Sequence, residues 1–422
     1  MSSSPASSVP VPRLLLPLGA AVILSLTGDQ TMYASLATQT EVVRISITAV
    51  GVMLGVNRLV RIPGNPLGGW LVDRFGRRCP FIAGMLLGTI STALCGLAVG
   101  FWPLLLARAL WGIAWTLINV TAMTMVMDIT TPADRGRTAG LYQISVLMGL
   151  SIMAVGSGAL VDTLGFRQTL FLGAGVTGVG LLISLLALPE TAPAVQRFPP
   201  EPVGRWTWRR VRDGLRRQIT PPILISIILY GLTNLAGNGV VMSTVGLLLR
   251  LRYGEMVPWG DRALGVPTLA GLLLGIGPIM GIIAGPLAGW LSDRAGQRWR
   301  VMRWGLALGI LGFALLSFDG AVAVIAAGVM VAAFADGVLT PTTMAQTGDL
   351  SRRGRQGVVM GLYAAGGDLG SATGPFLAYA LAYLLELKWV YVLCMALYFL
   401  ALLATWSVGR ERASSPREIP SL

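Results

Sequence analysis

The sequence predicts an all-α membrane protein in which twelve transmembrane helices form two parallel six-helix repeats. The chain has 422 residues, of which 54% are hydrophobic and only 12% are charged, whereas an average soluble protein carries about 25% charged residues. Its apolar residues come in blocks of about 20 or more, the length that a helix needs to cross a bilayer. Segments of the first half recur 220 or 221 positions later. An outer-membrane barrel would instead show short strands of alternating polarity.

The apolar blocks fall into two groups of six, separated by the longest polar connection in the chain. The expected spans cover residues 14–36, 43–70, 80–99, 102–127, 138–160, 168–188, 221–248, 266–290, 302–318, 321–347, 357–384 and 387–408. We therefore expect a disordered N-terminus (1–13), an N-terminal bundle (14–189), a cytoplasmic linker (190–220), a C-terminal bundle (221–408) and a cytoplasmic tail (409–422).

The formal net charge of +13 carries information about topology and does not indicate nucleic-acid binding. Arginines concentrate in the loops after even-numbered spans, whereas the loops after odd-numbered spans are poorer in them. Because positive loops stay in the cytoplasm, both termini are expected inside, in a multi-pass protein of the inner membrane. In the linker, Trp208, Val211 and Leu215 share one face of a basic amphipathic helix expected on the anionic leaflet. The alternative is a solvated linker.

Several chemistries are not expected from this composition. The three cysteines have no CxxC spacing and histidine is absent, so we expect no disulfide framework, metal site or cofactor, and any proton relay must use carboxylates. The sequence has no GxxxxGK[ST] motif, so direct use of ATP is not expected. Without a nucleophile constellation or an added soluble domain, it does not indicate an enzyme.

One short charged stretch is written twice. "GGWLVDRFGRR" runs from Gly68 to Arg78, and "AGWLSDRAGQR" runs from Ala288 to Arg298. Gly69 suits close helix packing, the carboxylate of Asp73 suits a helix N-terminus, and Gly76 permits a tight turn. The repeat extends further, because "GLY" recurs at Gly140 and Gly361, with Asp128 and Asp349 each 12 residues earlier.

This stretch resembles the G-x-x-x-D-R/K-x-G-R/K-R/K signature between helices 2 and 3 of the major facilitator superfamily. The matching gating residues are Gly69, Asp73, Arg74, Gly76, Arg77 and Arg78, with Asp293, Arg294, Gly296 and Arg298 in the second half. The resemblance covers nearly the whole chain and implies the major facilitator fold, with a substrate site between the halves. It also implies that Asp73 meets the start of helix 11, near Gly357, in a latch that closes the cytoplasmic side.

Ionisable residues within the spans are candidate proton-coupling or substrate residues, because charge in the membrane is costly. They are Asp29, Arg58, Arg61, Arg108, Asp336 and Asp368. We hypothesise that Arg61 and Asp368, at similar estimated depth, form a protonation-sensitive bridge between the halves. A permanent ion pair that only specifies packing is the alternative.

Two further acids carry their own hypotheses. Asp29 is expected to pair with Arg58 or with Arg108, which resembles the helix 4 arginine of proton-coupled members of the superfamily. Such a pair would let a proton or a cationic substrate compete for the carboxylate, unless the charges only neutralise each other. Asp336 is a candidate proton or cation site, or else reaches water where Gly337 and Pro341 break the helix.

The function expected from these observations is secondary active transport of a small organic solute by alternating access, with proton-coupled export preferred. Helix 5 lacks the Gly-Pro of many antiporters in this superfamily, having Met153 and Ala154 there, so a symporter or facilitator for uptake is the alternative. A transport-inactive sensor on the same scaffold is an alternative of another class. Expected partners are the solute, protons and the lipid bilayer, and the protein is expected to be a monomer. Several aromatic residues could line a cavity or simply pack: Trp111, Trp115, Tyr142, Tyr230 and Tyr363.

Overall fold

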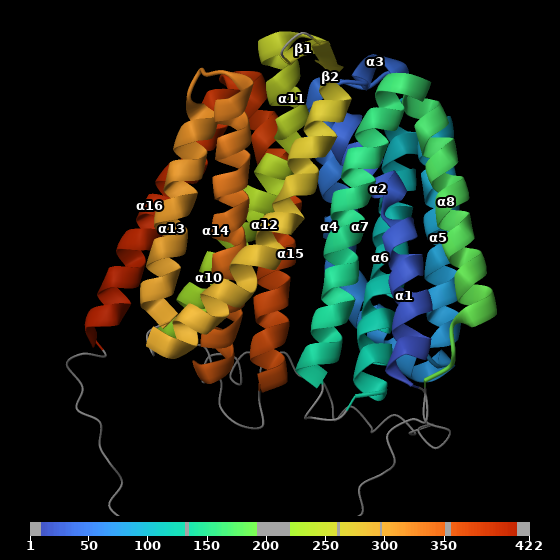
Figure 1. Cartoon of the computed structure of the whole chain (residues 1–422), viewed down its shortest axis with the longest axis horizontal. Helices are drawn as coiled ribbons and strands as arrows, with labels where there is room; N and C mark the ends of the chain where they lie inside the picture. Colours follow the sequence, from blue (N-terminus) through green and yellow to red (C-terminus); the bar gives the residue numbers. More distant parts are fainter. Residues whose placement is uncertain are drawn as a thin grey trace, which may run out of the picture. The chain divides into compact units, whose positions relative to one another are not determined.

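The computed structural model describes residues 10–130, 135–191, 220–259, 262–295, 298–350 and 356–411, and these parts are almost entirely helical (Figure 1). They form twelve long helical segments. These are α1 Val11–Ser25 continued by α2 Thr27–Ser35, α4 Ile47–Phe75, α5 Arg78–Leu97, α6 Phe101–Asp128, α7 Arg135–Leu164, α8 Phe166–Ala187, α10 Pro221–Asn234 continued by the π-helix η1 Leu235–Val241 and α11 Met242–Tyr253, α12 Val266–Ala295, α13 Arg298–Ser317, α14 Val322–Leu350, α15 Gln356–Leu384 and α16 Leu387–Glu411. The linker expected to hold an amphipathic helix lies almost entirely outside the described residues.

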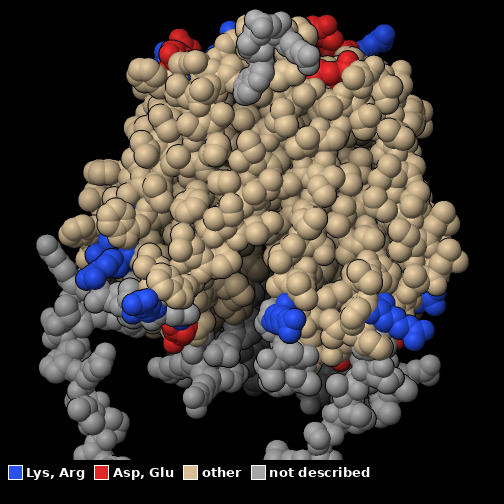
Figure 2. Space-filling view, in the orientation of Figure 1, with Lys and Arg blue, Asp and Glu red and all other residues tan. Residues whose placement is uncertain are grey.

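Ten of these segments are long and apolar enough to cross a membrane. The two that fall outside this set are α4, which carries Arg58 and Arg61, and α15, which carries Asp368 and several glycines. These two helices are also the ones that carry Arg61 and Asp368, the residues of the predicted bridge. On the face shown in Figure 2, charged side chains lie towards the helix ends and the middle carries none.

The chain divides into two compact units. The first unit holds α1 to α8 together with residues 239–279 and 372–383, so that parts of α11, α12 and α15 pack with the N-terminal helices. In this unit α5 packs on α6 and α8, α4 packs on α6, and α1 packs on α7 and α8 (Figure 1). A buried apolar cluster between them includes Leu18, Phe81, Ile118 and Tyr142.

The second unit holds α10, the latter part of α12, α13, α14, the first part of α15, and α16. In it α13 packs on both α14 and α16. Three glycines one turn apart on α13 make this possible, because side chains there would press on Leu339, Tyr398 and Ala332. These glycines are Gly305, Gly309 and Gly312. Small residues at such contacts are typical of helices that associate in membranes.

Some local structure departs from the expectations. The first helix begins at Val11, inside the segment expected to be disordered, because Pro12 is compatible with a first helical turn. The last helix continues to Glu411, inside the expected tail. A hairpin of two short antiparallel strands, β1 Met256–Trp259 and β2 Arg262–Gly265, follows α11 in what was expected to be a loop. A short helix, α3 Thr40–Val43, lies between the first two spans.

The predicted break in the helix that carries Asp336 is wrong. The helix α14 runs unbroken from Val322 to Leu350 through both Gly337 and Pro341. Gly337 is used for packing, since a side chain there would meet Ala284 and the backbone of Gly281 on α12 at 2.8 and 2.9 Å. Neighbouring helices also allow a proline to remain inside a membrane helix.

The close contact between α6 and α4 predicts a specific sensitivity. A methyl group at Gly112 would overlap the backbone carbonyl oxygen of Asn57, so Gly112→Ala must push the two helices apart. We expect a loss of about 1–3 kcal/mol of stability, measured as a lower midpoint of thermal unfolding in detergent. Gly156→Ala is the matched control, because a methyl group there meets nothing within 4 Å. Equal effects of the two changes would contradict the packing described here.

Candidate functional site

The repeated loop motif is built around a buried arginine. Arg77 is 7% exposed, and its Nε donates to Asp128 Oδ2 at 2.9 Å across the ends of α4, α5 and α6. Its Nη1 donates to the carbonyl oxygen of Val72 at 3.2 Å and lies 3.8 Å from Asp73. Thr191 also donates to Asp128, at 2.9 Å. Arg77, one of the gating residues implied by the resemblance, therefore ties the turn to α6.

A second acid closes the same turn. Glu190 follows α8 and accepts hydrogen bonds from the backbone N–H groups of Arg77 and Arg78, both at 3.0 Å. These are free N–H groups at the start of α5, where negative charge is favourable. Gly76 has φ 81°, a conformation that glycine adopts readily, and a side chain there would press on the Glu190 carboxylate.

The second repeat contains the matching ion pair. Arg298 Nε donates to Asp349 Oδ2 at 2.7 Å, and these residues lie 221 positions after Arg77 and Asp128. The repeat also keeps a cation–π contact, since Arg74 and Arg294 each lie 5.3 Å from the ring centroid of the tryptophan four residues earlier. The side chain of Asp293 and the whole of Gly296 lie outside what the structure describes.

Two residues of the motif have few described contacts. The side chain of Asp73 is 77% exposed, and a methyl group at Gly69 would meet no described atom within 4 Å. The glycine that does pack is its neighbour Gly68, which faces Thr116 of α6. The expected contacts of Gly69 with a neighbouring helix and of Asp73 with the start of helix 11 stay predictions.

Deeper in the first unit, five residues of α2, α4 and α6 form a central cluster: Asp29, Tyr33, Asn57, Arg58 and Arg108. Arg108 is 1% exposed, and its Nη1 donates to Asp29 Oδ1 at 2.7 Å. Its Nε donates to the carbonyl oxygen of Met53 at 3.0 Å. Asn57 adds a 3.3 Å hydrogen bond to the same oxygen of Asp29. Of the two pairings left open for Asp29, the structure has the one with Arg108.

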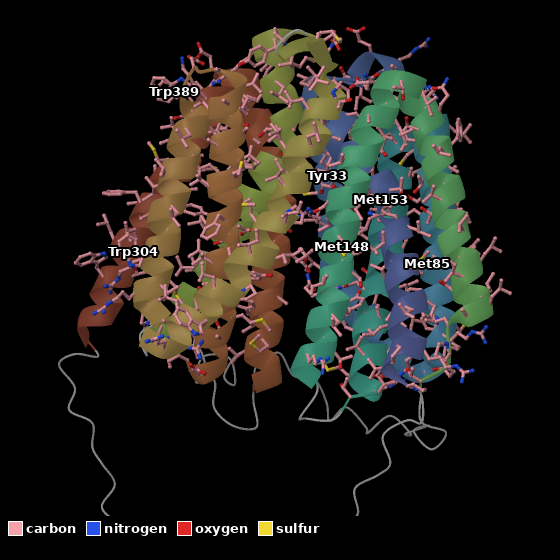
Figure 3. All side chains as sticks on the ribbon, in the orientation of Figure 1. Tyr33, Met85, Met148, Met153, Trp304 and Trp389 are labelled. Atoms are coloured by element: carbon pink, nitrogen blue, oxygen red, sulfur yellow. The ribbon has the colours of Figure 1, made fainter. Side chains whose placement is uncertain are left out.

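Arg58 joins the cluster through a tyrosine. Its Nε donates to the Tyr33 hydroxyl at 3.0 Å, and that hydroxyl donates to the carbonyl oxygen of Leu54 at 3.1 Å. The guanidinium carbons of Arg58 and Arg108 lie 5.4 and 5.9 Å from the centroid of the same ring. Figure 3 shows Tyr33 at mid-height on α2. Two cations thus lie near one aromatic ring, whose quadrupole attracts cations placed over its face.

The backbone explains why these side chains meet. Gly112 lies one turn after Arg108 on the same face of α6 and lets α6 touch the backbone of α4 at Asn57. Gly28 precedes Asp29 and faces Thr92 of α5 so closely that no side chain fits. The chain turns at Leu26 between α1 and α2, where Leu26 N–H donates to the Ile23 carbonyl oxygen.

The central cluster retains unused hydrogen-bonding capacity. Arg108 Nη2 and Asn57 Oδ1 are buried and have no hydrogen-bond partner among the described residues, and the same holds for Nε2 of Gln30, which follows Asp29 in the chain. A buried polar atom without a partner costs about 1–3 kcal/mol. The cluster can therefore hold a polar group of a solute, or ordered water, beside the ion pair.

In the second unit, Asp336 on α14 stands apart from any described base. Its Oδ1 is buried and has no hydrogen-bond partner among the described residues. The carboxylate faces Gly237 in the π-helix, where a methyl group would lie 3.4–3.6 Å from it. π-Helical turns within α-helices are frequent at functional sites. The sequence signalled Asp336 but gave no sign of the π-helix.

A line of hydroxyl groups follows Asp336 along one face of α14. Thr340, Thr343 and Thr347 come four, seven and eleven residues later, and Thr343 and Thr347 are fully buried. The Thr343 hydroxyl is 2.9 Å from the Tyr363 hydroxyl, which also donates to the Thr340 carbonyl oxygen at 3.1 Å. This polar face was missed, although the spacing of four, three and four residues could have revealed it.

The remaining predicted residues can each be placed on a helix. Arg61 on α4 and Asp368 on α15 are each half-buried, and their bridge stays a prediction. The aromatic residues mainly pack: Trp111 and Tyr142 are buried, and Tyr230 stacks on Tyr363 with 4.0 Å between ring centroids. Trp304 and Trp389, labelled in Figure 3, are exposed on α13 and α16 as interface anchors would be.

The comparisons with known proteins agree on one family. The protein-family model that is described as Major Facilitator Superfamily matches residues 18–260 and 256–421 of this chain. The tetracycline resistance protein, class C, of Escherichia coli is 26% identical over 373 residues, covering 86% of this chain and 88% of that protein. The multidrug resistance protein MdtG of Citrobacter koseri is 22% identical over 366 residues, covering 86% and 85%.

Solved structures show the same fold. The nucleoside transporter NupG aligns with a TM-score of 0.76 at 12% identity, covering 93% of this chain and 99% of that one. The human organic anion transporter MFSD10 aligns with a TM-score of 0.66 at 17% identity, covering 94% and 100%.

The two loop ion pairs should differ in strength. Arg77 and Asp128 have side chains only 9% and 15% exposed, against 23% and 59% for Arg298 and Asp349. A double-mutant cycle with Arg77→Gln and Asp128→Asn should give a coupling energy of about 2 kcal/mol. The same cycle on Arg298 and Asp349 should give less than about 1 kcal/mol. Unfolding midpoints in denaturant measure both, and equal couplings would refute the difference.

Proposed function

The chain belongs to the major facilitator superfamily and is a membrane transporter; on this premise we propose that it exports a small organic solute by proton-coupled alternating access. The observation that carries the proposal is the pair of differently partnered acids in the bundle interiors. Asp29 is held by a buried arginine, whereas Asp336 faces no described base. An exporter driven by protons needs a carboxylate that is able to lose its proton while the solute is moved.

The solute is assigned to the central cluster. Arg108 keeps one buried N–H group unused, and Asn57 keeps a carbonyl oxygen unused, so together they present a donor and an acceptor beside Asp29. Arg58 and Tyr33 supply a cation and an aromatic face. This combination suits a molecule with a planar apolar body and a polar edge, the chemistry of many antibiotics and dyes.

The proton is assigned to Asp336. A carboxylate buried in a membrane bundle without a base is costly in its charged form, so it is held neutral until water or a cation reaches it. Asp29 has a different environment, because Arg108 and Asn57 both donate hydrogen bonds to its Oδ1. The two acids therefore have different tasks.

Direction is proposed from two features. The similar proteins include a tetracycline resistance protein and multidrug resistance proteins. In addition, Arg108 of α6, the fourth span, resembles the helix 4 arginine of proton-coupled exporters. Uptake is the second candidate, because Met153 and Ala154 stand where helix 5 of many antiporters has Gly-Pro. Both termini are proposed to be cytoplasmic, from the arginine-rich loops after even-numbered spans.

Transport into inverted membrane vesicles tests the proposed function. We expect tetracycline, a planar cationic dye or an organic acid to trigger proton release from vesicles that carry an imposed proton gradient. The Asp336→Asn variant should bind the same solute but release no protons, because an amide cannot give up a proton. Accumulation of solute without any proton gradient would favour a facilitator, and proton release by Asp336→Asn would remove this residue from the mechanism.

The ion pair of the central cluster gives a separate prediction. Asp29→Asn leaves Arg108 buried without its counter-charge, which should cost about 3–5 kcal/mol of stability. Adding Arg108→Gln should restore most of that loss, because the uncompensated charge is then removed. Neither protein should transport, since both lack the groups that hold the solute. Unfolding midpoints and vesicle uptake measure the two effects, and a double variant as unstable as Asp29→Asn would contradict the pairing.

A further inference from the structure

A stretch at the end of α7 repeats the spacing of the loop motif at the opposite end of the first bundle. The motif reads Gly69-x3-Asp73-x2-Gly76-x-Arg78, and the chain also reads Gly158-x3-Asp162-x2-Gly165-x-Arg167. Gly76 and Gly165 each connect two long helices and have φ of 81° and 90°. Because α5, α6 and α7 run up, down and up through the bundle, the α4–α5 and α7–α8 turns lie at opposite ends (Figure 1).

The acid of this second stretch is engaged with the start of another helix. Asp162 Oδ2 accepts hydrogen bonds from the backbone N–H of Thr268, at 2.9 Å, and from the Thr268 hydroxyl. Thr268 is the third residue of α12, so its N–H is one of those that a helix start leaves free. Gly265 leaves room for the carboxylate, since any side chain there would overlap it.

Close backbone packing continues from this contact along the two helices. A methyl group at Gly158 would overlap the carbonyl oxygen of Pro267, and one at Gly271 would overlap that of Ala154. A methyl group at Gly275 would lie 3.0 Å from the carbonyl oxygen of Ser151. These contacts join α7 of the first repeat to the start of α12 of the second repeat, inside one compact unit.

The basic residue of the stretch fixes its surroundings. Arg167 donates to the carbonyl oxygens of Gly96 at 2.7 Å, Val42 at 3.1 Å and Ala98 at 3.3 Å. It therefore ties the α7–α8 turn to α3 and to the turn after α5. The side chains of Arg77 and Arg78 likewise tie the α4–α5 turn to Asp128 of α6 and to the Leu185 carbonyl oxygen of α8.

The two stretches are in different states. At the first, Asp73 is mostly exposed and a methyl group at Gly69 would meet nothing within 4 Å. At the second, Asp162 caps α12 and Gly158 touches it. The second repeat carries no matching acid, because the position 221 residues after Asp162 is Tyr383.

We propose that Asp162, with Gly158, Gly165 and Arg167, is a latch that holds the end of the bundle opposite the loop motif closed. Its carboxylate stabilises the docked start of α12 through the free N–H groups and dipole of that helix. The latch opens when α12 leaves α7, and Asp73 is then free to engage at the other end. The two copies of the motif within the first repeat are thus engaged in turn, Asp162 at one end and Asp73 at the other. The proposal rests on the alternating access of the proposed function, but not on the identity of the solute or of the coupling ion.

Spin labels across the seam test the latch without any transport assay. Labels are placed at Val99 and Leu251, which are exposed at this end in the first and second repeats, in full-length protein whose Cys79, Cys95 and Cys394 are changed to serine. Pulsed electron paramagnetic resonance in nanodiscs gives the distance distribution. Asp162→Asn should raise the ratio of long to short distances by about tenfold, the scale expected for losing a helix cap.

Matched variants separate the latch from general damage. Gly265→Ala, which displaces the same carboxylate, should shift the distribution in the same direction, and Asp73→Asn should shift it the opposite way. Thr163→Val is the control, because the Thr163 hydroxyl donates only within α7, to Ala159 and Leu160. If Asp162→Asn folds poorly, Gly265→Ala decides. An unchanged distribution in Asp162→Asn and Gly265→Ala, or an equal shift in Thr163→Val, overturns the proposal.

Discussion

A charge placed between membrane helices must be paired, neutralised or hydrated, and the interior of this transporter is organised around that constraint. Arg108 meets it by pairing with Asp29 and by donating to a carbonyl oxygen of α4. Asp336 has no such partner among the described residues, and its carboxylate faces Gly237 of the π-helix. The difference between these two acids underlies the division of labour proposed here, with one carboxylate holding the solute site and the other carrying the proton.

Backbone contact at glycine makes these arrangements possible. Arg108 reaches Asp29 because Gly112 brings α6 against α4, and Asp336 faces the π-helix because Gly237 offers no side chain. The same device joins α7 to α12 through Gly158 and Gly271. In lipid, where apolar burial between helices brings little net gain, such contacts and buried polar bonds specify which helices meet. Glycine thus shapes both the central cluster and the contact between α7 and α12.

Much of the architecture followed from the sequence because membrane helices must be long, apolar and internally hydrogen-bonded. The spans, the repeat and the in-membrane charges were all visible as patterns along the chain, and Asp29 was narrowed to two partners. Three contacts could not be seen as patterns in the sequence, because they join residues 51 to 113 positions apart. They are the pairing of Asp29 with Arg108, the ion pair of Arg77 with Asp128, and the cap that Glu190 provides. The helix break at Gly337 and Pro341, one of the two alternatives for Asp336, is not formed, and the packing of Gly337 on α12 could not be seen in the sequence.

Infrared difference spectroscopy of the carboxyl groups tests the central claim directly. The account predicts a protonated carboxylic acid band in the resting transporter that disappears in Asp336→Asn and persists in the Asp29→Asn, Arg108→Gln double variant. Addition of solute under a proton gradient should bleach the same band. A band that belongs to Asp29, or a spectrum with no protonated acid that Asp336→Asn removes, would contradict the assignment of the two acids.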